Sequence, residues 1–411
     1  MRRDLRPWWT LAATAVLALA AVGCRCGSST PGKPGKASTA LEAIPGDVDV
    51  VIAINTEGLR QGSLGEFLYT PWVVRQLADW GGPTCATLAS QTTRRAALGL
   101  RLARAQEFFF AAEGPTLEEV KRCIDEHAKR QGLAASFEEV SGVRGLTDSR
   151  GLHMLAAGEH VVVRAFPFAN LTVLGEAAKV ARGDVPNLAG NAAFCELISE
   201  LGGDVTVALS ETQQLLSAYG QGLEETVAGM IPPDLCASPL EVQMFLGTAR
   251  ALGLGELAGI DAVLKAKFAG RESICLRDVV QEIFRTTSGV RSAGATLTGR
   301  ADIELGLVLV FADEASATEV RGVLGDLIHA LSVLPQNLDK LERDWPIVIS
   351  WIQKHVDLPT LRTVLRNPLF KHLSVLGEGL KVELRLRVEE SDVRAAVENT
   401  QQLLTKLVAR N

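Results

Sequence analysis

The feature that most constrains the fold is a strand-to-helix junction that occurs three times in the sequence. Glu-Val-Lys-Arg-Cys-Ile at 119–124 opens an amphipathic segment, and the same type of pattern returns at 319–324 and 392–397. Each copy follows an apolar run typical of a strand, and its acidic residue suits the first helical turn. Chance similarity between such junctions is the alternative. We interpret the repetition as a β-β-α unit that is used several times.

Strict alternation near the C-terminus indicates how the sheets are exposed. In 381–388 every second residue is apolar, and the residues between them are charged. A sheet with one wet face favours antiparallel pairing, with helices on the other face. The chain is therefore predicted to be an α+β protein, with mostly antiparallel sheets and helices on one face. The residues expected to point inward are Val382, Leu384, Leu386 and Val388, and those expected to point outward are Lys381, Glu383, Arg385 and Arg387.

Apolar periodicity gives a coarse map of the other elements. The segment 48–54 is apolar on both faces apart from Asp49, as in a central strand. Further strands are predicted at 96–102, 106–112, 135–140, 143–147, 151–156, 160–166, 204–209, 240–247, 260–268, 293–299, 302–311, 371–376 and 380–388. Helices are predicted from Pro115, at 170–181, 191–201, 212–229, 274–287, 314–333 and 391–409, and in a Trp-bearing segment at 336–366.

Prolines at 232, 233 and 239 mark the best internal boundary, because proline interrupts both helix and strand. We therefore expect two α+β lobes, at 44–232 and 239–411. With 411 residues, the chain is long enough to bury more than one core.

The N-terminus has the pattern of an export signal. Arg2, Arg3 and Arg6 precede a 17-residue apolar stretch at 7–23, and a Gly-, Ser-, Pro- and Lys-rich run follows. An uncleaved membrane anchor is the alternative, at the low end of the ~17–25 residues that span a bilayer. No other apolar run approaches that length.

Ala21-Val22-Gly23-Cys24 resembles the lipobox of bacterial lipoproteins. The resemblance implies a signal peptide at 1–23, a lipidated Cys24 as first mature residue, and a flexible tether at 24–43. Arg25 follows Cys24 where an inner-membrane retention signal has Asp, so outer-membrane attachment is expected. The strand and helix pattern behind the Pro-x-Asp-x-Asp opening at 45–49 is similar to uncharacterised exported α/β repeat lipoproteins, with no catalytic residue to carry over.

Charge and cysteine content narrow the function classes. The net charge of −6 argues against nucleic-acid binding and against a peripheral hold on anionic lipid. Lipidation of Cys24 leaves six of the seven cysteines in an oxidising compartment, with no Cys-x-x-Cys pair. We hypothesise a Cys85–Cys123 bridge, because these residues flank the first β-β-α unit. Buried thiols are the alternative, as expected for Cys195 and Cys275.

No set of residues in the sequence indicates a particular reaction, a metal site or a cofactor. Gly-x-Gly-x-x-Ala at 253–258 fits a dinucleotide fingerprint, but the strand-like alternation that follows favours a hairpin loop. His153 and His160 lie on adjacent predicted strands, so a hydrolase site assembled from distant residues is the alternative function.

The densest apolar stretch of the mature chain surrounds Trp345 and Trp351. It packs on the second sheet or forms a groove for an apolar ligand or an envelope protein. The favoured interpretation is a non-enzymatic binding or scaffolding module, tethered to the membrane through its N-terminal lipid.

Overall fold

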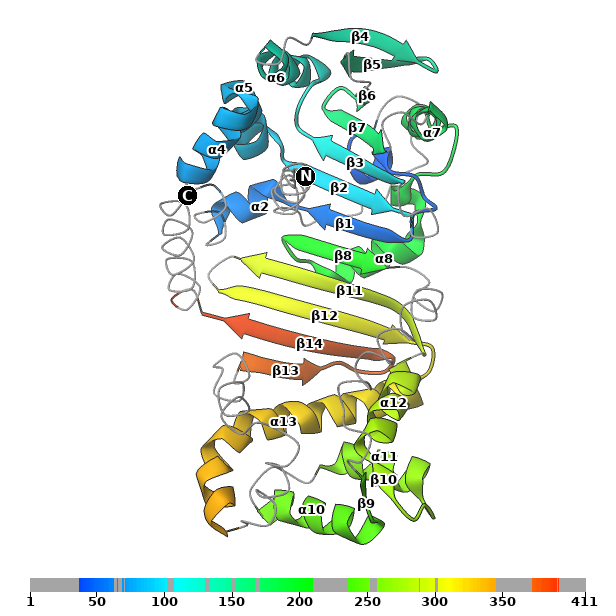
Figure 1. The fold of residues 1–411 in the computed structure, drawn as a ribbon. Helices are drawn as coiled ribbons and strands as arrows, with labels where there is room; N and C mark the ends of the chain where they lie inside the picture. Colours follow the sequence, from blue (N-terminus) through cyan, green and yellow to red (C-terminus); the bar gives the residue numbers. More distant parts are fainter. Residues whose placement is uncertain are drawn as a thin grey trace, which may run out of the picture. The chain divides into compact units, whose positions relative to one another are not determined.

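The computed structural model describes residues 37–209, 236–344 and 372–391, apart from short loops. Those loops are 63–64, 66–68, 70, 102–106, 130–133, 149–152, 167–170, 252–256, 288, 300–301 and 390. The chain divides into two compact units (Figure 1). The first comprises Met1–Ser210, Gly294–Leu305 and Val388–Asn411, and the second Glu211–Ala293 and Gly306–Arg387.

The two units are discontinuous, whereas the two predicted lobes, 44–232 and 239–411, are continuous. Residues 294–305 belong to the first unit because they hydrogen-bond beside its last strand. The Asp204 N–H donates to the Leu297 carbonyl over 2.9 Å, and the Gly299 N–H donates to the Asp204 carboxylate over 3.0 Å. Sheet pairing thus joins segments that the prolines at 232–239 separate in sequence.

An antiparallel sheet forms the first unit. Its hydrogen-bonded order is β8-β1-β2-β3-β7-β6-β5-β4, with the later part of β11 next to β8. The strands are β1 (Val50–Ile54), β2 (Arg95–Leu100), β3 (Phe108–Glu113), β4 (Ala135–Val140), β5 (Val143–Asp148), β6 (His153–Gly158), β7 (Val161–Phe166) and β8 (Val205–Leu209). The helices are α2 (Thr56–Gln61), α4 (Pro71–Gly81), α5 (Pro83–Thr87), α6 (Leu117–Lys129), α7 (Leu171–Arg182) and α8 (Ala192–Leu201), with short turns η1 (Leu41–Ala43), η2 (Leu88–Thr92) and η4 (Leu188–Gly190).

The β-β-α unit predicted from the repeats is present. It occurs as β2-β3-α6 and β6-β7-α7 in this unit, and as β11-β12-α13 further along the chain. The acidic residue of the first junction completes a capping box: the Thr116 N–H donates to the Glu119 carboxylate over 2.9 Å, and the Glu119 N–H donates to Thr116 Oγ1 over 3.3 Å. The pattern at 119–124 therefore reflects how the helix begins.

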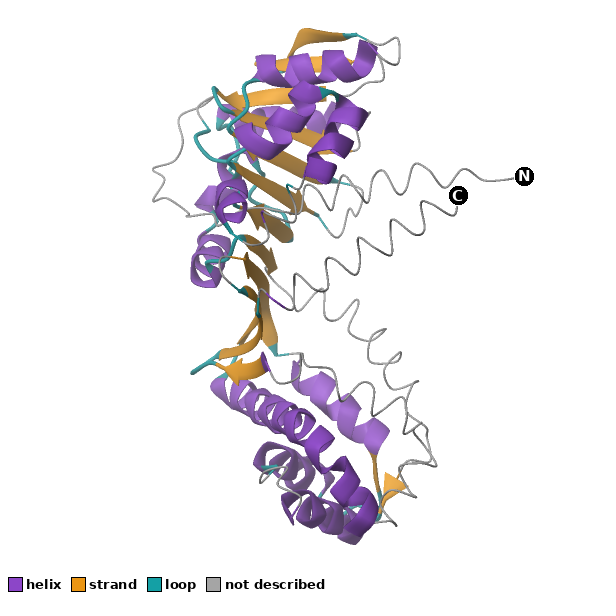
Figure 2. Cartoon of the chain, turned by 90° about the vertical axis from the view of Figure 1, so that its left-hand side faces the viewer, coloured by secondary structure: helices purple, strands orange, loops and turns teal. Residues whose placement is uncertain are grey.

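Helices lie on both faces of the first sheet, which corrects the expectation of helices on one face (Figure 2). On one face, small residues such as Ala53 and Ala97 form a dense core with Val173, Ala177 and Phe194 of α7 and α8. On the other face, Leu117 and Val120 of α6 pack on Ala112, Leu146 and Val162. The strands of this unit are apolar on both sides, so both faces have side chains to bury.

The ordered body begins earlier than predicted, and the end of the predicted tether at 24–43 packs into the core. Leu41 and Ala43 are buried in η1. The Ala37 N–H donates to the Ala157 carbonyl of β6 over 3.0 Å, and the Leu188 N–H donates to the Ile44 carbonyl over 2.8 Å. The sequence predicts residues 40–43 as linker, despite the apolar Ala40, Leu41 and Ala43, because Gly, Ser, Pro and Lys dominate the residues just before them.

The second unit combines a sheet of order β11-β12-β14-β13 with four helices of the described chain. The helix α13 covers the sheet: its Ala317 and Val320 cluster with Val290, Phe311 and Val382. The strands are β9 (Cys236–Ala237), β10 (Ile274–Cys275), β11 (Val290–Gly299), β12 (Ile303–Phe311), β13 (Leu373–Leu376) and β14 (Lys381–Val388). The helices are α10 (Pro239–Ala251), α11 (Ala258–Phe268), α12 (Leu276–Thr287) and α13 (Glu314–Asp344).

The predicted strands 240–247 and 260–268 are wrong, because both segments are helical. Pro239 occupies the first turn of α10, and the Ser238 N–H donates to the Glu241 carboxylate over 2.7 Å. Leu246 and Ala249 lie one turn apart and are buried with Leu264 and Phe268 of α11. A helix therefore precedes 253–258, which excludes the dinucleotide fingerprint and also the predicted hairpin loop.

The α+β fold class and the antiparallel sheet are confirmed. In β14, Val382 is fully buried and Arg387 is exposed, as the alternation predicts. The other residues of the strand, inward or outward in the prediction, are all half-buried. Among the described residues, no helix has both the length and the apolar content that crossing a membrane requires.

Candidate functional site: an apolar sheet face

The register of five strands in the first unit aligns apolar side chains into rows. Directly paired residues of antiparallel strands point to the same side of the sheet. The first row across β8, β1, β2, β3 and β7 is Leu209, Val50, Leu100, Phe108 and Phe166. The second row is Val207, Ile52, Leu98, Phe110 and Arg164. We call these ten residues the apolar face.

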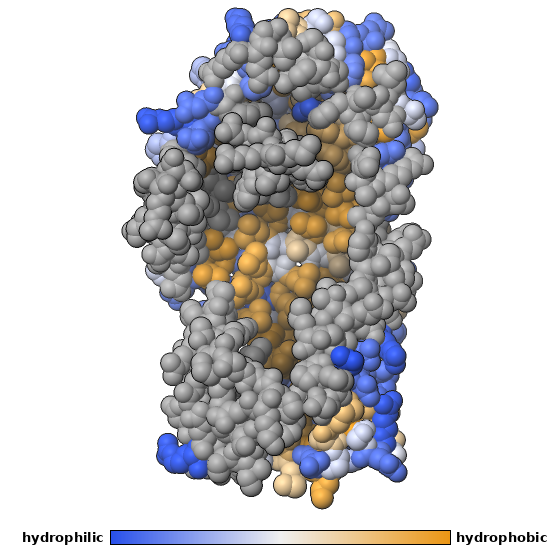
Figure 3. Space-filling model, viewed as in Figure 1, coloured by the Kyte–Doolittle hydropathy of each residue, from blue (hydrophilic) through white to orange (hydrophobic). Residues whose placement is uncertain are grey.

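The third row on the same side is Val205, Ile54, Ala96, Ala112 and Val162, and all five are buried. The first two rows are different: apart from the buried Val50, every side chain in them is partly exposed. Figure 3 shows apolar side chains gathered over the strands of the first unit. Eight apolar residues of the two rows are therefore partly open to water, and an exposed apolar patch of this kind is typical of a binding surface.

An aromatic pair and one cation lie at the β7 end of the apolar face. The rings of Phe108 and Phe166 stack with centroids 3.9 Å apart. The Arg164 guanidinium carbon lies 4.6 Å from the Phe166 ring centroid, within cation–π range. Among the described residues of β8, β1, β2, β3 and β7 that point to this side, Arg164 alone is charged.

The histidines of the hydrolase hypothesis are not brought together. His153 is the first residue of β6, whereas His160 lies in the turn after the end of β6, roughly 17 Å or more further along the strand. His153 Nδ1 lies 2.5 Å from the Glu138 carboxylate, and His160 Nε2 lies 3.9 Å from the Glu159 carboxylate. Each histidine has an acidic neighbour, but no shared site forms.

Three predicted site residues, Cys24, Trp345 and Trp351, lie outside the described residues. The other two, Cys85 and Cys123, form a disulfide that joins α5 to α6. Cys195 belongs to neither bridge, and its Sγ lies 3.5 Å from the Ala189 carbonyl oxygen. Among the described residues, no group of His, Cys, Asp and Glu is arranged to hold a metal ion.

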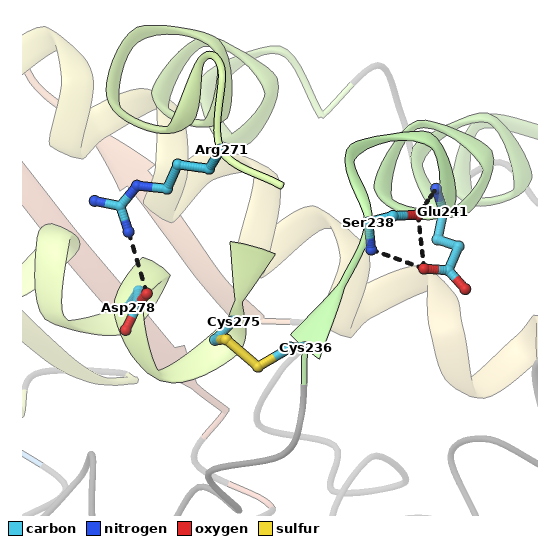
Figure 4. Close-up of a disulfide and its surroundings, with 6 residues drawn as sticks. All are labelled: Cys236, Ser238, Glu241, Arg271, Cys275 and Asp278. Carbon is cyan, nitrogen blue, oxygen red and sulfur yellow. Dashed lines mark hydrogen bonds and ion pairs between the residues drawn. A yellow bond between two sulfur atoms is a disulfide. The ribbon is translucent and has the colours of Figure 1, made fainter. Parts of the chain in front are cut away.

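The sequence does not predict the second disulfide, Cys236–Cys275, because the residues around Cys275 favour a small buried thiol there. The two cysteines pair directly in the short β9–β10 ribbon, just before α10 and α12 begin (Figure 4). An ion pair between Arg271 and Asp278 over 3.2 Å lies nearby. Beyond the bridge, α10 exposes Leu240, Met244 and Phe245 (exposed fractions 72%, 61% and 49%).

Arg101 and Glu113 are two of the buried charged residues of the first unit. Arg101 is only 6% exposed and binds Glu107 over 3.3 Å, together with Asp47 and Glu176. Hydrogen bonding to Glu176 raises the pKa of Arg101. Glu113 is buried at the end of β3, and burial raises the pKa of its carboxyl against the opposing effect of Arg95, 3.8 Å away. Neither group points to the side of the sheet that carries the apolar face, since Glu113 alternates with Ala112 and Arg101 with Leu100.

The apolar face was missed from the sequence, although part of its signal was visible there. The segment 48–54 was interpreted as apolar on both sides, and the prediction treated both sides as core. Which side stays open depends on the pairing of residues as distant as Val50 and Leu209. Spacing within any one strand does not contain that information.

No protein-family model matches the chain, and no curated protein matches it significantly. The chain is similar to three solved structures of TP0453. Crystal form III has 9% identity and a TM-score of 0.39, covering 88% of this chain and 99% of that chain. Crystal form I has 10% identity and a TM-score of 0.37, covering 89% of this chain and 98% of that chain. Crystal form IV has 9% identity and a TM-score of 0.35, covering 88% of this chain and 97% of that chain. Similarity this low carries no argument about function.

Proposed function

We propose that this protein is a membrane-tethered envelope lipoprotein whose first unit binds an apolar ligand without catalysing a reaction. The observation that carries the proposal is the pair of partly exposed rows, nine apolar side chains and Arg164, on one side of the sheet. Covering such a surface removes apolar area from water, at ~25 cal/mol per Å².

The chemistry of the apolar face suits binding better than catalysis. Its side chains are aliphatic or aromatic, apart from one guanidinium. Arginine stays protonated in the physiological range and does not act as a general acid or base, and the other nine side chains of this face carry no nucleophile, acid or base. The energy available there is that of burial, ~0.8 kcal/mol for each methylene group of a ligand.

The lipid tether would keep this binding unit at the membrane surface. From Cys24 to Ala37, the first described residue, the chain advances 13 residues. Fully extended, that segment reaches ~45 Å at most. The ordered unit would then stay within that distance of the acylated end, close to a source of apolar molecules.

Titration with Nile red, an uncharged apolar dye, tests the proposal. The wild type is compared with Leu100→Glu in the apolar face and with Leu240→Glu on α10, a matched change at another exposed leucine. We expect the wild type and Leu240→Glu to bind alike and Leu100→Glu to bind at least about tenfold more weakly. Thermal unfolding of each variant checks that the fold is retained. Absence of binding by the wild type, or equal binding by all three proteins, would overturn the proposal.

A further inference from the structure

We infer that the ligand of the apolar face is a long-chain fatty acid, whose carboxylate binds Arg164 while its chain lies across the strands. The inference rests on the proposed function and adds the class of ligand. It starts from the position of Arg164, the one charged residue among the ten described residues of the apolar face.

Arg164 is fixed on that side of the sheet by its neighbours. It pairs with Phe110 across β3 and β7, and its guanidinium carbon lies 4.6 Å from the Phe166 ring centroid. The stacked Phe108 lies next to Phe166 in the first row. The aromatic pair therefore holds the guanidinium at the end of both rows, where it borders the apolar side chains.

Charge complementarity selects the head group. The whole chain carries a net charge of −6, so the protein as a whole repels an anionic ligand. A local cation is then required to hold one. A guanidinium binds a carboxylate through two parallel hydrogen bonds, and low water content beside the phenyl rings strengthens that contact.

The length of the rows indicates how long the acyl chain of the ligand is. Each row crosses five strands, or four strand spacings of ~4.8 Å, which gives ~19 Å. That length is close to an extended palmitoyl chain. A polypeptide strand gains little here, because the backbone groups of these strands already pair with one another.

The test compares palmitate with hexadecanol, which has the same chain length and no charge, below their micellar concentrations. Wild-type protein should bind palmitate about tenfold more tightly, a difference of ~1.4 kcal/mol. In Arg164→Gln the preference should disappear while hexadecanol affinity stays unchanged, which shows that the apolar face is intact. Arg144→Gln is the matched control: it removes one positive charge at a site where Arg144 binds Glu118, and it should keep the preference.

The outcomes separate the two proposals. If the wild type binds both compounds equally, or if Arg164→Gln keeps the preference, the fatty-acid inference is wrong and the proposed function stands. If the wild type binds neither compound, and Nile red also fails to bind, the proposed function is wrong as well. Tighter binding of phosphatidylglycerol than of palmitate would replace the single-chain carboxylate with a phospholipid and overturn the inference.

Discussion

Phe108 and Phe166 stack across the β3–β7 pair, with ring centroids 3.9 Å apart and ring planes 16° apart. Paired aromatic rings of this kind are stabilised by ~0.5–1.5 kcal/mol beyond their burial. Both rings are partly exposed, so the stacked pair lies at the edge of the apolar face. The Phe166 ring also contacts the Arg164 guanidinium. Charged groups and disulfides elsewhere in the structure lead to separate predictions about its stability.

Arg101→Met should destabilise the first unit by about 3 kcal/mol, because it leaves Glu107 and Glu176 close together without their shared cation. Urea unfolding measures the change in free energy. Arg144→Met is the control, since Arg144 and Glu118 are both exposed and such pairs contribute ~0–1 kcal/mol. Equal losses in the two variants would show that the Arg101 cluster has no special structural role.

Glu113→Gln should stabilise the protein at neutral pH. Burial raises the pKa of Glu113 in the folded state, so the folded protein binds a proton at this carboxylate more tightly than the unfolded protein does. The wild type therefore loses stability as the pH rises from the unfolded pKa of ~4.3 through the raised folded value, and the gain from the Gln variant should shrink towards pH 4. Melting temperatures between pH 4 and 7.5 measure this.

Glu118→Gln should have the opposite effect on stability at neutral pH. A backbone hydrogen bond at the start of α6 and the bond from Arg144 lower the pKa of this exposed carboxyl. The variant should lose stability at neutral pH, and the loss should fade as acid protonates Glu118 in the wild type. If both variants change the melting temperature in the same direction, the electrostatic assignment of Glu113 is wrong.

Each disulfide should stabilise its own unit. Replacing Cys85 and Cys123 by Ser opens a loop of 38 residues, worth ~4 kcal/mol in the chain-entropy model. Amide hydrogen exchange should then speed up in α5 and α6 and remain unchanged in α10 and α12. The double replacement of Cys236 and Cys275, 39 residues apart, should give the reverse pattern. Loss of protection throughout the chain in both variants would contradict this division.

Cys24→Ser should abolish incorporation of labelled palmitate in cells, because the thiol at that position carries the diacylglycerol in proteins with a lipobox. Cys26→Ser, two residues away, should keep the label. Labelling that is equal in the wild type and Cys24→Ser would point to the uncleaved anchor instead.

Local patterns predicted local structure well where a segment's own residues determine it. The alternation in 381–388 predicted the strand β14. The pattern that begins at Glu119 predicted the start of the helix α6. The segment 240–247 also alternates, and it misled the prediction because Pro239 and the Ser238–Glu241 capping box start a helix there. Capping signals outweigh a short alternation, and they were visible in the sequence.

Long-range structure was beyond the sequence patterns. The Cys236–Cys275 bridge depends on the pairing of two very short strands 39 residues apart. The apolar face depends on the joint register of β8, β1, β2, β3 and β7, which brings Leu209 beside Val50. Packing decides both, so neither the bridge nor the open side of the sheet follows from apolar periodicity.

Photocrosslinking with a diazirine-bearing palmitic acid tests the central claim most directly. After irradiation of the bound wild-type protein, mass spectrometry maps the labelled residues. We predict labels within β1, β2, β3 and β8, on residues such as Ile52, Leu98 and Val207, and competition by unmodified palmitate. Labels confined to Leu240, Met244 and Phe245 of α10, or to residues 345–371, would contradict the assignment of the apolar face as the binding site.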